Sequence, residues 1–202
     1  MLFAPYLQRR RGSLVPPISF VGRVDANTTT AAGVHASVLA GDLGIWCAVD
    51  DGNALTFTGG VNGTPALAQA IDGTLISMLA GSKILTSTSD TGVISESVSR
   101  IRSLVFRGAS GITASAQMTG TGTAITIPAA TVASPNSAAL AIVGWSSNAS
   151  ITTDPSGMAN LFTVPSPIGI AAFLSTGISA FAGDGLSIST SREWTAITLI
   201  IH

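Results

Sequence analysis

The sequence predicts an all-β fold: a two-sheet antiparallel β-sandwich with jelly-roll or Greek-key connections, preceded by an extended N-terminal arm. The first observation is composition, because only 9% of the 202 residues are charged while the chain holds 25 serines and 23 threonines. The second is a series of short runs rich in β-branched residues and separated by Gly, Asn, Asp and Pro, which is typical of sandwiches and barrels. The third is the pair Pro16 and Pro17, which separates an arm from a body.

Residues 1–17 form the predicted docking arm, and residues 18–202 form the predicted β-sandwich domain. Consecutive prolines hold the backbone extended and interrupt helix and strand pairing, so they mark the boundary. Residues 1–23 carry four arginines and no acidic residue, whereas the rest of the chain has five basic and ten acidic residues. A basic arm on an acidic body indicates an arm that docks on an acidic surface of another subunit; the alternative is a solvated tail. The expected docking residues are Phe3, Tyr6, Arg9, Arg10 and Arg11.

The first half of the body contains alternating segments. Residues 18–24 and 43–49 read as strands, and Leu43, Ile45, Cys47 and Val49 fall on one face by the two-residue period. Residues 50–53, Asp-Asp-Gly-Asn, predict a turn.

The Gly-rich stretch 55–70 predicts a long loop. Residues 75–79 and 84–86 flank Ala-Gly-Ser at 80–82 and predict a hairpin. A short helical turn within 65–78 is the alternative for that part, because its apolar residues fit helix spacing only loosely.

The second half continues the strand pattern. Residues 139–145 are apolar on both faces, which predicts a central strand covered on both sides. The chain ends on a strong strand, so we expect that end to be paired into a sheet. The remaining expected strands are 100–107, 112–118, 124–127, 159–164, 168–174, 178–181 and 194–201.

A weak internal repeat is also visible. Residues 34–42 lead into the apolar strand with Trp46, and residues 127–136 lead into the apolar strand with Trp145. An apolar strand that begins with arginine follows in each half, at residues 102–106 and 192–201. Two similar halves suit a two-sheet sandwich. A composition this biased could also produce the pattern by chance.

Few residues could carry acid–base or metal chemistry. The only histidines are His35 and the last residue, His202, so a Ser–His–Asp arrangement and a His/Cys metal cluster are not expected. The only cysteine, Cys47, excludes an intramolecular disulfide and reads as a small buried side chain. We expect no cofactor, no metal and no enzyme activity.

The sequence contexts of the carboxylates indicate a role in turns more strongly than a role in catalysis. Glu96 and Glu193, the only glutamates, lie in no recognisable catalytic context. Calcium binding or glycoside hydrolysis by the aspartates is the alternative. The residues concerned are Asp50, Asp51, Asn53, Asp154 and Asp184, each also a good turn residue. No phosphate-binding loop is present, because the Gly-rich segments lack the required lysine and helix.

The larger side chains have structural interpretations. Trp46, Trp145 and Trp194 all lie in expected strands, which favours core or subunit-interface packing over sugar stacking. Arg100, Arg102 and Arg107 could form a basic stripe, for which we expect an ion-pair role at a subunit contact.

Membrane insertion and nucleic-acid binding are not expected. No apolar stretch approaches the 18 or so residues of a membrane-spanning helix. The N-terminus places its arginines after a short apolar piece, the reverse of a secretory signal, so the chain is expected to stay in the cytoplasm until assembly. The arm has no interleaved aromatics beyond Tyr6, which disfavours nucleic-acid contact.

Three landmarks resemble a β-sandwich found in bacteriophage virion proteins and related bacterial surface modules. They are Ala40-Gly41-Asp42-Leu43 opening one strand, Ser134-Pro135-Asn136-Ser137 opening its partner, and Glu193-Trp194-Thr195-Ala196-Ile197-Thr198-Leu199 closing the chain. The resemblance spans most of residues 18–202 and specifies an architecture more than a role. It implies attachment to a virion, often through a separate N-terminal arm.

These observations predict a non-enzymatic virion structural protein, a head decoration or a short spike or fibre attached through its arm and assembled in the host cytoplasm. Its expected partners are capsid, portal or tail subunits and further copies of itself, with a trimer expected. The absence of a coiled coil favours a compact decoration over a long fibre. The alternative is a tail-tip module that binds a receptor or host-surface glycan through loops 51–66 and 147–158. A polysaccharide hydrolase is the third alternative.

Overall fold

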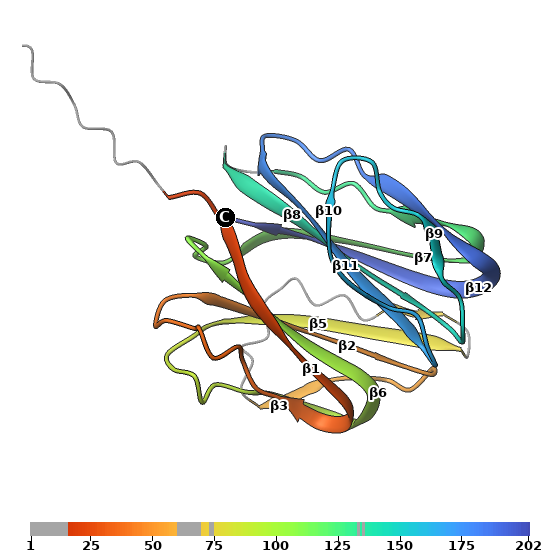
Figure 1. Cartoon of the computed structure of the whole chain (residues 1–202), viewed down its shortest axis with the longest axis horizontal. Coiled ribbons are helices and arrows are strands. Elements are labelled where there is room, and N and C mark those ends of the chain that lie inside the picture. Colours follow the sequence, from red (N-terminus) through yellow and green to blue (C-terminus); the bar gives the residue numbers. More distant parts are fainter. Residues whose placement is uncertain (1–15, 60–69, 73–74, 133, 135) are drawn as a thin grey trace, which may run out of the picture.

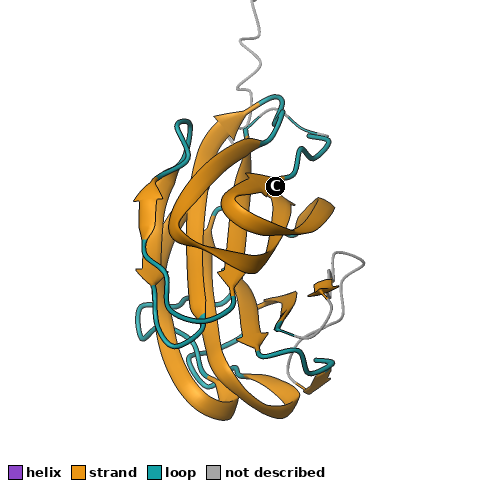
Figure 2. Ribbon diagram, turned by 90° about the vertical axis from the view of Figure 1, so that its right-hand side faces the viewer, coloured by secondary structure: helices purple, strands orange, loops and turns teal. Residues whose placement is uncertain are grey.

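The chain folds into antiparallel β-sheets. The computed structural model describes residues 16–59, 70–72, 75–132, 134 and 136–202. Within these residues it contains twelve strands and no helix, and every strand pair is antiparallel, which confirms the predicted all-β class (Figure 2). The described residues contain no helix long and apolar enough to cross a bilayer.

The first half of the chain forms one sheet. Its strand order is β1-β6-β2-β5-β4, and β3 also pairs with β6. The strands are β1 (Ser19–Ala32), β2 (Leu43–Asp50), β3 (Phe57–Gly59), β4 (Ala70–Asp72), β5 (Ile76–Ile84) and β6 (Gly92–Arg107).

The second half forms the other sheet, and Figure 1 shows its strands stacked on those of the first half. Its strand order is β10-β11-β8-β12-β7, and β9 also pairs with β12. The strands are β7 (Ile112–Ile127), β8 (Ser137–Trp145), β9 (Ile151–Thr153), β10 (Ala159–Val164), β11 (Gly169–Ile178) and β12 (Asp184–Ile201).

The two sheets have the same connectivity. Each strand of the first sheet corresponds to the strand six places later, including the side pairing of β3 with β6 and of β9 with β12. The register is also the same. Leu43 pairs with Phe106 and Ile84, as Ala138 pairs with Ile201 and Thr176.

The strand pairing shows the same irregularity in both halves. Between the pairs Phe20–Phe106 and Gly22–Val105 the register shifts, and it shifts again between Ile112–Ile201 and Ala114–Ile200. A shared bulge at the same position is strong support for an internal duplication.

The predicted repeat is therefore present, but its landmarks are not equivalent residues. Trp46 pairs with Ser103, whereas the corresponding Ala141 pairs with Thr198. Trp145 corresponds to Asp50, since both end their strands opposite equivalent residues of β5 and β11.

A central hydrophobic cluster joins the sheets, an arrangement consistent with the predicted β-sandwich. Leu43, Ile45 and Val49 of the first sheet meet Leu140 and Ile142 of the second in this cluster. A further cluster around Trp46 covers the opposite face of the first sheet, and one around Trp145 covers that of the second. Strands β2 and β8 are fully buried because both of their faces are covered, as predicted for β8.

The halves are related by an approximate two-fold axis along the strands between β2 and β8. Strand β4 contacts β7 and β12, and β5 contacts β8 and β12. At the other side, Arg23 of β1 donates to the carbonyl of Leu161 in β10. The β4 edge of the first sheet therefore faces the β7 edge of the second, and the β1 edge faces the β10 edge. A two-fold axis along the strands requires this arrangement, because it relates β1 to β7 and β4 to β10.

Several local predictions were wrong. The expected hairpin at 80–82 is the middle of one continuous strand, β5, and the expected strands 112–118 and 124–127 are parts of the single strand β7. Within the expected strand 178–181, Ile178 ends β11 and Phe181 forms only an isolated bridge to Ala130.

Candidate functional site

A pocket of about 520 Å³ lies at the end of the body where β2 and β8 finish. We call it the axial pocket. Loops after β2 and β8, the starts of β5 and β11, and parts of β7 and β12 build it. Its lining residues are Asp51, Leu75, Thr121, Ser146, Ser147, Pro167, Ile168, Ser191, Arg192 and Glu193.

The axial pocket lies close to the approximate two-fold axis. Asp51 and Ser146 are equivalent, because each directly follows the last residue of a central strand. Leu75 and Pro167 are equivalent by the matching registers of β5 and β11. Both halves of the chain are therefore needed to form the pocket.

Turn chemistry shapes the rim of this pocket. The predicted turn after β2 is present: Asn53 Nδ2 donates to Asp50 Oδ2 at 2.7 Å, and Gly52 has φ of 84°. After β8, Ser147 adopts φ of 61°, a left-handed conformation that is uncommon for a residue with a side chain. Strained residues of this kind concentrate at functional sites.

Strand β12 carries a run of unpaired polar atoms beside the pocket, and two of the residues in this run, Arg192 and Glu193, line it. Arg192 Nε, Glu193 Oε2, Trp194 Nε1 and Thr195 Oγ1 are all buried and have no hydrogen-bond partner among the described residues. Unpaired buried polar atoms are rare in folded proteins, and four in succession call for an explanation. The pairing of β12 with β7 is interrupted between Ser187 and Arg192, immediately before this run.

Two hydrogen bonds join this part of β12 to the loop after β8. The Ser146 N–H donates to the Glu193 carbonyl at 2.9 Å. Arg192 Nη2 donates to the carbonyl of Asn148 at 3.2 Å. The loop after β8 is thus tied to β12, so the charged side chains of the pocket stand on a fixed framework.

A second, shallower hollow of about 380 Å³ lies between β9 and β10. Asp154, Asn160 and Thr163 line it, together with the hydroxyl-rich segment 150–153. Asn160 Nδ2 donates to Thr163 Oγ1 at 3.0 Å, so these polar groups are engaged with one another.

Of the five residues named for calcium binding or catalysis, Asp50 and Asn53 share a hydrogen bond, but the described aspartates do not form a metal site. Among the described residues no group of three or more His, Cys, Asp or Glu side chains is positioned to hold a metal. Asp184 accepts hydrogen bonds from the N–H groups of Gly157 and Gly185, which is turn chemistry. Only Asp51 of the five residues lines the axial pocket.

The two histidines lie elsewhere. His35 Nδ1 accepts a hydrogen bond from the Ser37 N–H, and the backbone of His202 pairs with Ser110 and Gly111. Neither lines the axial pocket.

The three arginines do not form a surface stripe. Arg107 makes a two-point pair with Asp42, with Nε–Oδ1 and Nη2–Oδ2 distances of 3.0 and 2.8 Å. The hydrogen bonds from Arg107 hold the pKa of Asp42 below its usual value. Arg100 and Arg102 instead point between the sheets, where burial lowers their pKa values and the charge of Asp25 opposes that effect.

These buried arginines belong to an inter-sheet cluster of Arg23, Asp25, Asn27, Arg100 and Arg102. Arg102 Nε lies 3.0 Å from Asp25 Oδ1, and Asn27 Oδ1 accepts hydrogen bonds from both Arg100 and Arg102. Nearly all their bonds are internal, so we interpret this cluster as a cross-link between the sheets.

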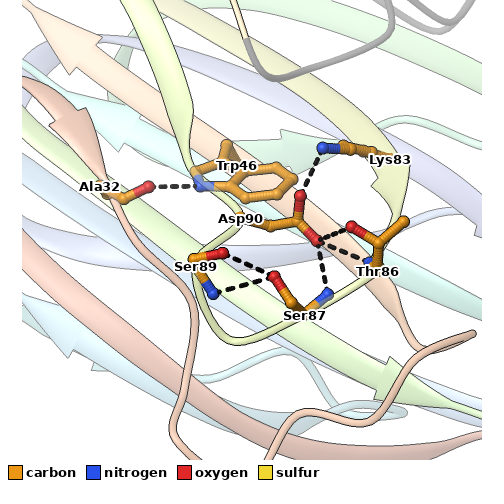
Figure 3. A network of polar contacts seen from close by, with 7 residues as sticks. All are labelled: Ala32, Trp46, Lys83, Thr86, Ser87, Ser89 and Asp90. Atoms are coloured by element: carbon orange, nitrogen blue, oxygen red, sulfur yellow. Dashed lines mark hydrogen bonds and ion pairs between the residues drawn. The ribbon is translucent and has the colours of Figure 1, made fainter.

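Figure 3 shows a third polar group, around Asp90. Burial disfavours its charge, but the Lys83 ammonium and the N–H groups of Thr86 and Ser87 outweigh that and hold the pKa of Asp90 well below its usual value. Nearby, Trp46 Nε1 donates to the Ala32 carbonyl at 2.9 Å. These hydrogen bonds hold the turn that connects β5 to β6 in place.

The interpretations of the tryptophans and the cysteine are confirmed. Trp46, Trp145 and Trp194 are buried in the hydrophobic clusters. Cys47 is fully buried, and burial raises the pKa of its thiol to about 12.

The expected docking residues Phe3, Tyr6, Arg9, Arg10 and Arg11 lie outside the described residues. The described chain begins at Pro16, where the carbonyl oxygens of Pro16 and Pro17 lie beside Gly108. A hollow of about 330 Å³ there is lined by Pro16, Asn136 and His202, among others. Asn136 precedes β8 and Ser146 follows it, so this hollow and the axial pocket lie at opposite ends of β8.

Comparisons with protein-family models, curated proteins and solved structures gave no match.

The sequence alone did not identify Arg192 and Glu193 as residues that line a pocket. One signal was available: apart from Asp184 at the start of β12, they are the charged residues of this strand. Their association with Asp51, far away in the chain, depends on the sheet packing.

Proposed function

We propose that this protein is a non-enzymatic structural component of a bacteriophage virion, a head decoration or a short spike or fibre. The observation that carries the proposal is that the two ends of the body differ. The chain enters at one end of β8, beside Gly108, and the axial pocket opens at the other end. Such a body can be attached at one end while the other faces outward.

The charges support attachment through residues 1–17. Within the described body, Lys83 and Arg107 pair with Asp90 and Asp42, and Arg23 and Arg102 pair with Asp25. The basic groups of the body are therefore largely engaged internally. The arginines of the arm supply the positive charge with which an acidic capsid, portal or tail subunit would interact.

Binding of a receptor or glycan is the second candidate, and the axial pocket favours it. Asp51, from the candidate loop 51–66, and Ser147, from the candidate loop 147–158, line the pocket, and Ser146 precedes the second loop. Pockets of roughly 300–1,000 Å³ are the usual size for small-molecule sites. This function is compatible with a virion location.

Self-association is part of the proposal, with a trimer as the expected state. Large apolar side chains that are exposed in the single chain are candidate contacts. Leu39 is 58% exposed, and Ile84 and Met118 are each 41% exposed. Light scattering on the purified full chain would measure the state directly.

Deletion of residues 1–17 tests the attachment proposal. The truncated body should keep the β-type circular dichroism of the full chain but fail to join particles assembled in infected cells. A triple Arg-to-Gln variant at positions 9, 10 and 11 should lose most incorporation, and the matched Arg-to-Lys variant should retain it. Normal loading of the truncated protein would show that the arm does not attach it.

A further inference from the structure

We infer that strand β7 pairs with the β7 of a second copy of the chain, so that the second sheet continues across a two-fold axis into its neighbour. This inference rests on the proposed self-association and deepens it by naming the strand that makes the contact. Strand β7 is the last strand of its sheet, and within the described residues it pairs with β12 alone. Such an edge presents a row of unpaired backbone N–H and C=O groups.

The other three edge strands of the two sheets carry features that hinder pairing with another chain. Strand β1 contains Arg23 and Asp25, and its register with β6 shifts twice. Strand β4 has three residues. Strand β10 has six residues and a register shift, and Pro165 follows it directly. Short strands, charges, bulges and prolines are the usual means by which proteins block an exposed sheet edge.

The central part of β7 lacks all of these features. The strand runs for 16 residues and contains no charged residue and no proline. Between Ala114 and Gly122 its register with β12 is unbroken. The side chains of Gln117, Met118 and Thr119 are exposed. Strand β4 lies close to β7 from the first sheet but shares no strand pairing with it. Strand β7 is therefore the edge that is open to a further strand.

Symmetry and charge favour a second copy as the occupant of this edge. In an antiparallel pair around a two-fold axis the central residue lies opposite its own counterpart, so a charge there would face a like charge. Strand β7 has no charge that would repel its copy. A foreign peptide at a sheet edge is normally selected by pockets that accept its alternate side chains. The exposed central residues Gln117, Met118 and Thr119 line none of the three hollows described above.

The unbroken segment sets the register of the pair. Its middle residue is Met118, so the axis places Met118 beside its own copy and Ala114 beside Gly122 of the neighbour. Met118 pairs with Ala196, which belongs to the cluster around Trp145, so its side chain lies on that outer face of the sheet. It is 41% exposed in the single chain. The two methionines would cover one another, and burial of apolar surface favours association.

Cysteine cross-linking of the full chain tests this register. Directly opposite residues of an antiparallel pair have Cα atoms about 4.5–5.5 Å apart, a distance that a disulfide spans. Met118→Cys should therefore form a disulfide-linked dimer on mild oxidation. Thr126→Cys is the matched control, because Thr126 is also exposed but lies near the end of β7, where its two copies would be roughly 50 Å apart. Cys47 is fully buried and does not compete.

Light scattering over a dilution series tests the association itself. The unmodified full chain should be a dimer. Met118→Lys should weaken the dimer by roughly tenfold or more, because it places two ammonium groups opposite each other, and Met118→Leu should remain dimeric. Leu39→Lys puts the same charge at an apolar residue that is 58% exposed elsewhere on the body, and it should leave the dimer unchanged. Circular dichroism should show the same β-type spectrum for every variant.

The outcomes separate the possible occupants of the edge. A monomer, or a trimer that Met118→Lys does not change, would overturn the inference. A dimer in which Met118→Cys does not cross-link would also overturn it, because an arm or another strand between the two β7 edges would hold the thiols roughly 10 Å apart. Particle loading of the arm variants is measured separately, so attachment through residues 1–17 is decided independently of this contact.

Discussion

Arg100 reaches from one sheet to the other, where its Nε–H donates to the carbonyl of Ile168 at 3.0 Å. Arg102, two residues along β6, is 1% exposed and lies on the same face. In the second sheet the equivalent positions hold Thr195 and Ile197, both fully buried. At equivalent positions, the first sheet therefore buries charged side chains and the second sheet buries uncharged ones.

This contrast predicts which substitutions the cluster tolerates. Asp25→Ala should lower the free energy of unfolding by about 2 kcal/mol, because it removes the carboxylate that faces Arg102. This is less than the roughly 3–5 kcal/mol of fully buried pairs, since the Asp25 side chain is 40% exposed.

The triple variant Asp25→Gln/Arg100→Thr/Arg102→Ile is the matched comparison. It introduces the residues found at the equivalent positions of the second sheet. It should change stability by no more than about 1 kcal/mol, because replacing a whole buried charged group with fitting uncharged residues is often neutral. Urea denaturation measures both. A larger loss in the triple variant than in Asp25→Ala would contradict the interpretation of the cluster as a dispensable cross-link.

Asp90 should make stability depend on pH in the acid range. Its pKa in the folded protein lies below its value in the unfolded chain, so the ionised form stabilises the fold. That contribution is present above the unfolded pKa of about 4 and is lost as the pH falls towards the folded pKa.

Asp90→Asn should therefore cost about 2 kcal/mol at pH 7 and flatten the acid limb of the stability curve. Asp154→Asn is the control, because the Asp154 side chain is exposed and has only a 3.5 Å contact with Asn160. Urea midpoints between pH 3 and 7 provide the measurement. An acid limb that is unchanged in Asp90→Asn would refute the assignment.

The class of fold was predictable because hydrophobic alternation reports directly on strands. Leu43, Ile45, Cys47 and Val49 were expected on one face, and all four lie in the central cluster. The hairpin at 80–82 was wrong because Ala-Gly-Ser resembles a turn locally, whereas pairing with Trp46 and its neighbours in β2 keeps the segment extended. Long-range pairing overrode local preference.

The axial pocket was less predictable because it joins residues that are distant in the sequence. Asp51 and Ser147 lie in the loops 51–66 and 147–158, which were expected to bind, but nothing local indicates that Glu193 lies near them. The duplicated register supplies that information, and single-sequence patterns do not reveal register. The predictions for the arm residues remain predictions, since they lie outside the described part of the chain.

Cys47 should be inert in the folded protein. The thiolate is the reactive form, and burial raises the pKa of this thiol to about 12. A thiol reagent such as Ellman's reagent should label no cysteine at pH 8 under native conditions and one cysteine per chain in urea. Fast native labelling would show that the centre of β2 opens readily.

The packing of Trp145 predicts a strict requirement for glycine at position 169. A β-carbon at this position would overlap the indole of Trp145, whose Nε1–H donates to the Ala149 carbonyl at 3.1 Å. Gly169→Ala should lower the free energy of unfolding by about 2–3 kcal/mol through overpacking. Gly33→Ala is the matched control, since its β-carbon would meet nothing within 4 Å, and it should change stability by less than about 0.5 kcal/mol. Equal stabilities of the two variants would contradict this packing.

The duplication predicts that the two halves associate without a covalent link. The chain passes between the sheets once, from β6 to β7, and Ser110 in this connection is exposed. Separate chains of residues 1–109 and 110–202 would each expose half of the central cluster, so they should bind one another when co-expressed. Co-purification through a tag on one fragment, with a thermal midpoint for the complex, measures the association. Recovery of each fragment alone as a stable monomer would show that the central cluster is not the interface that holds the halves together.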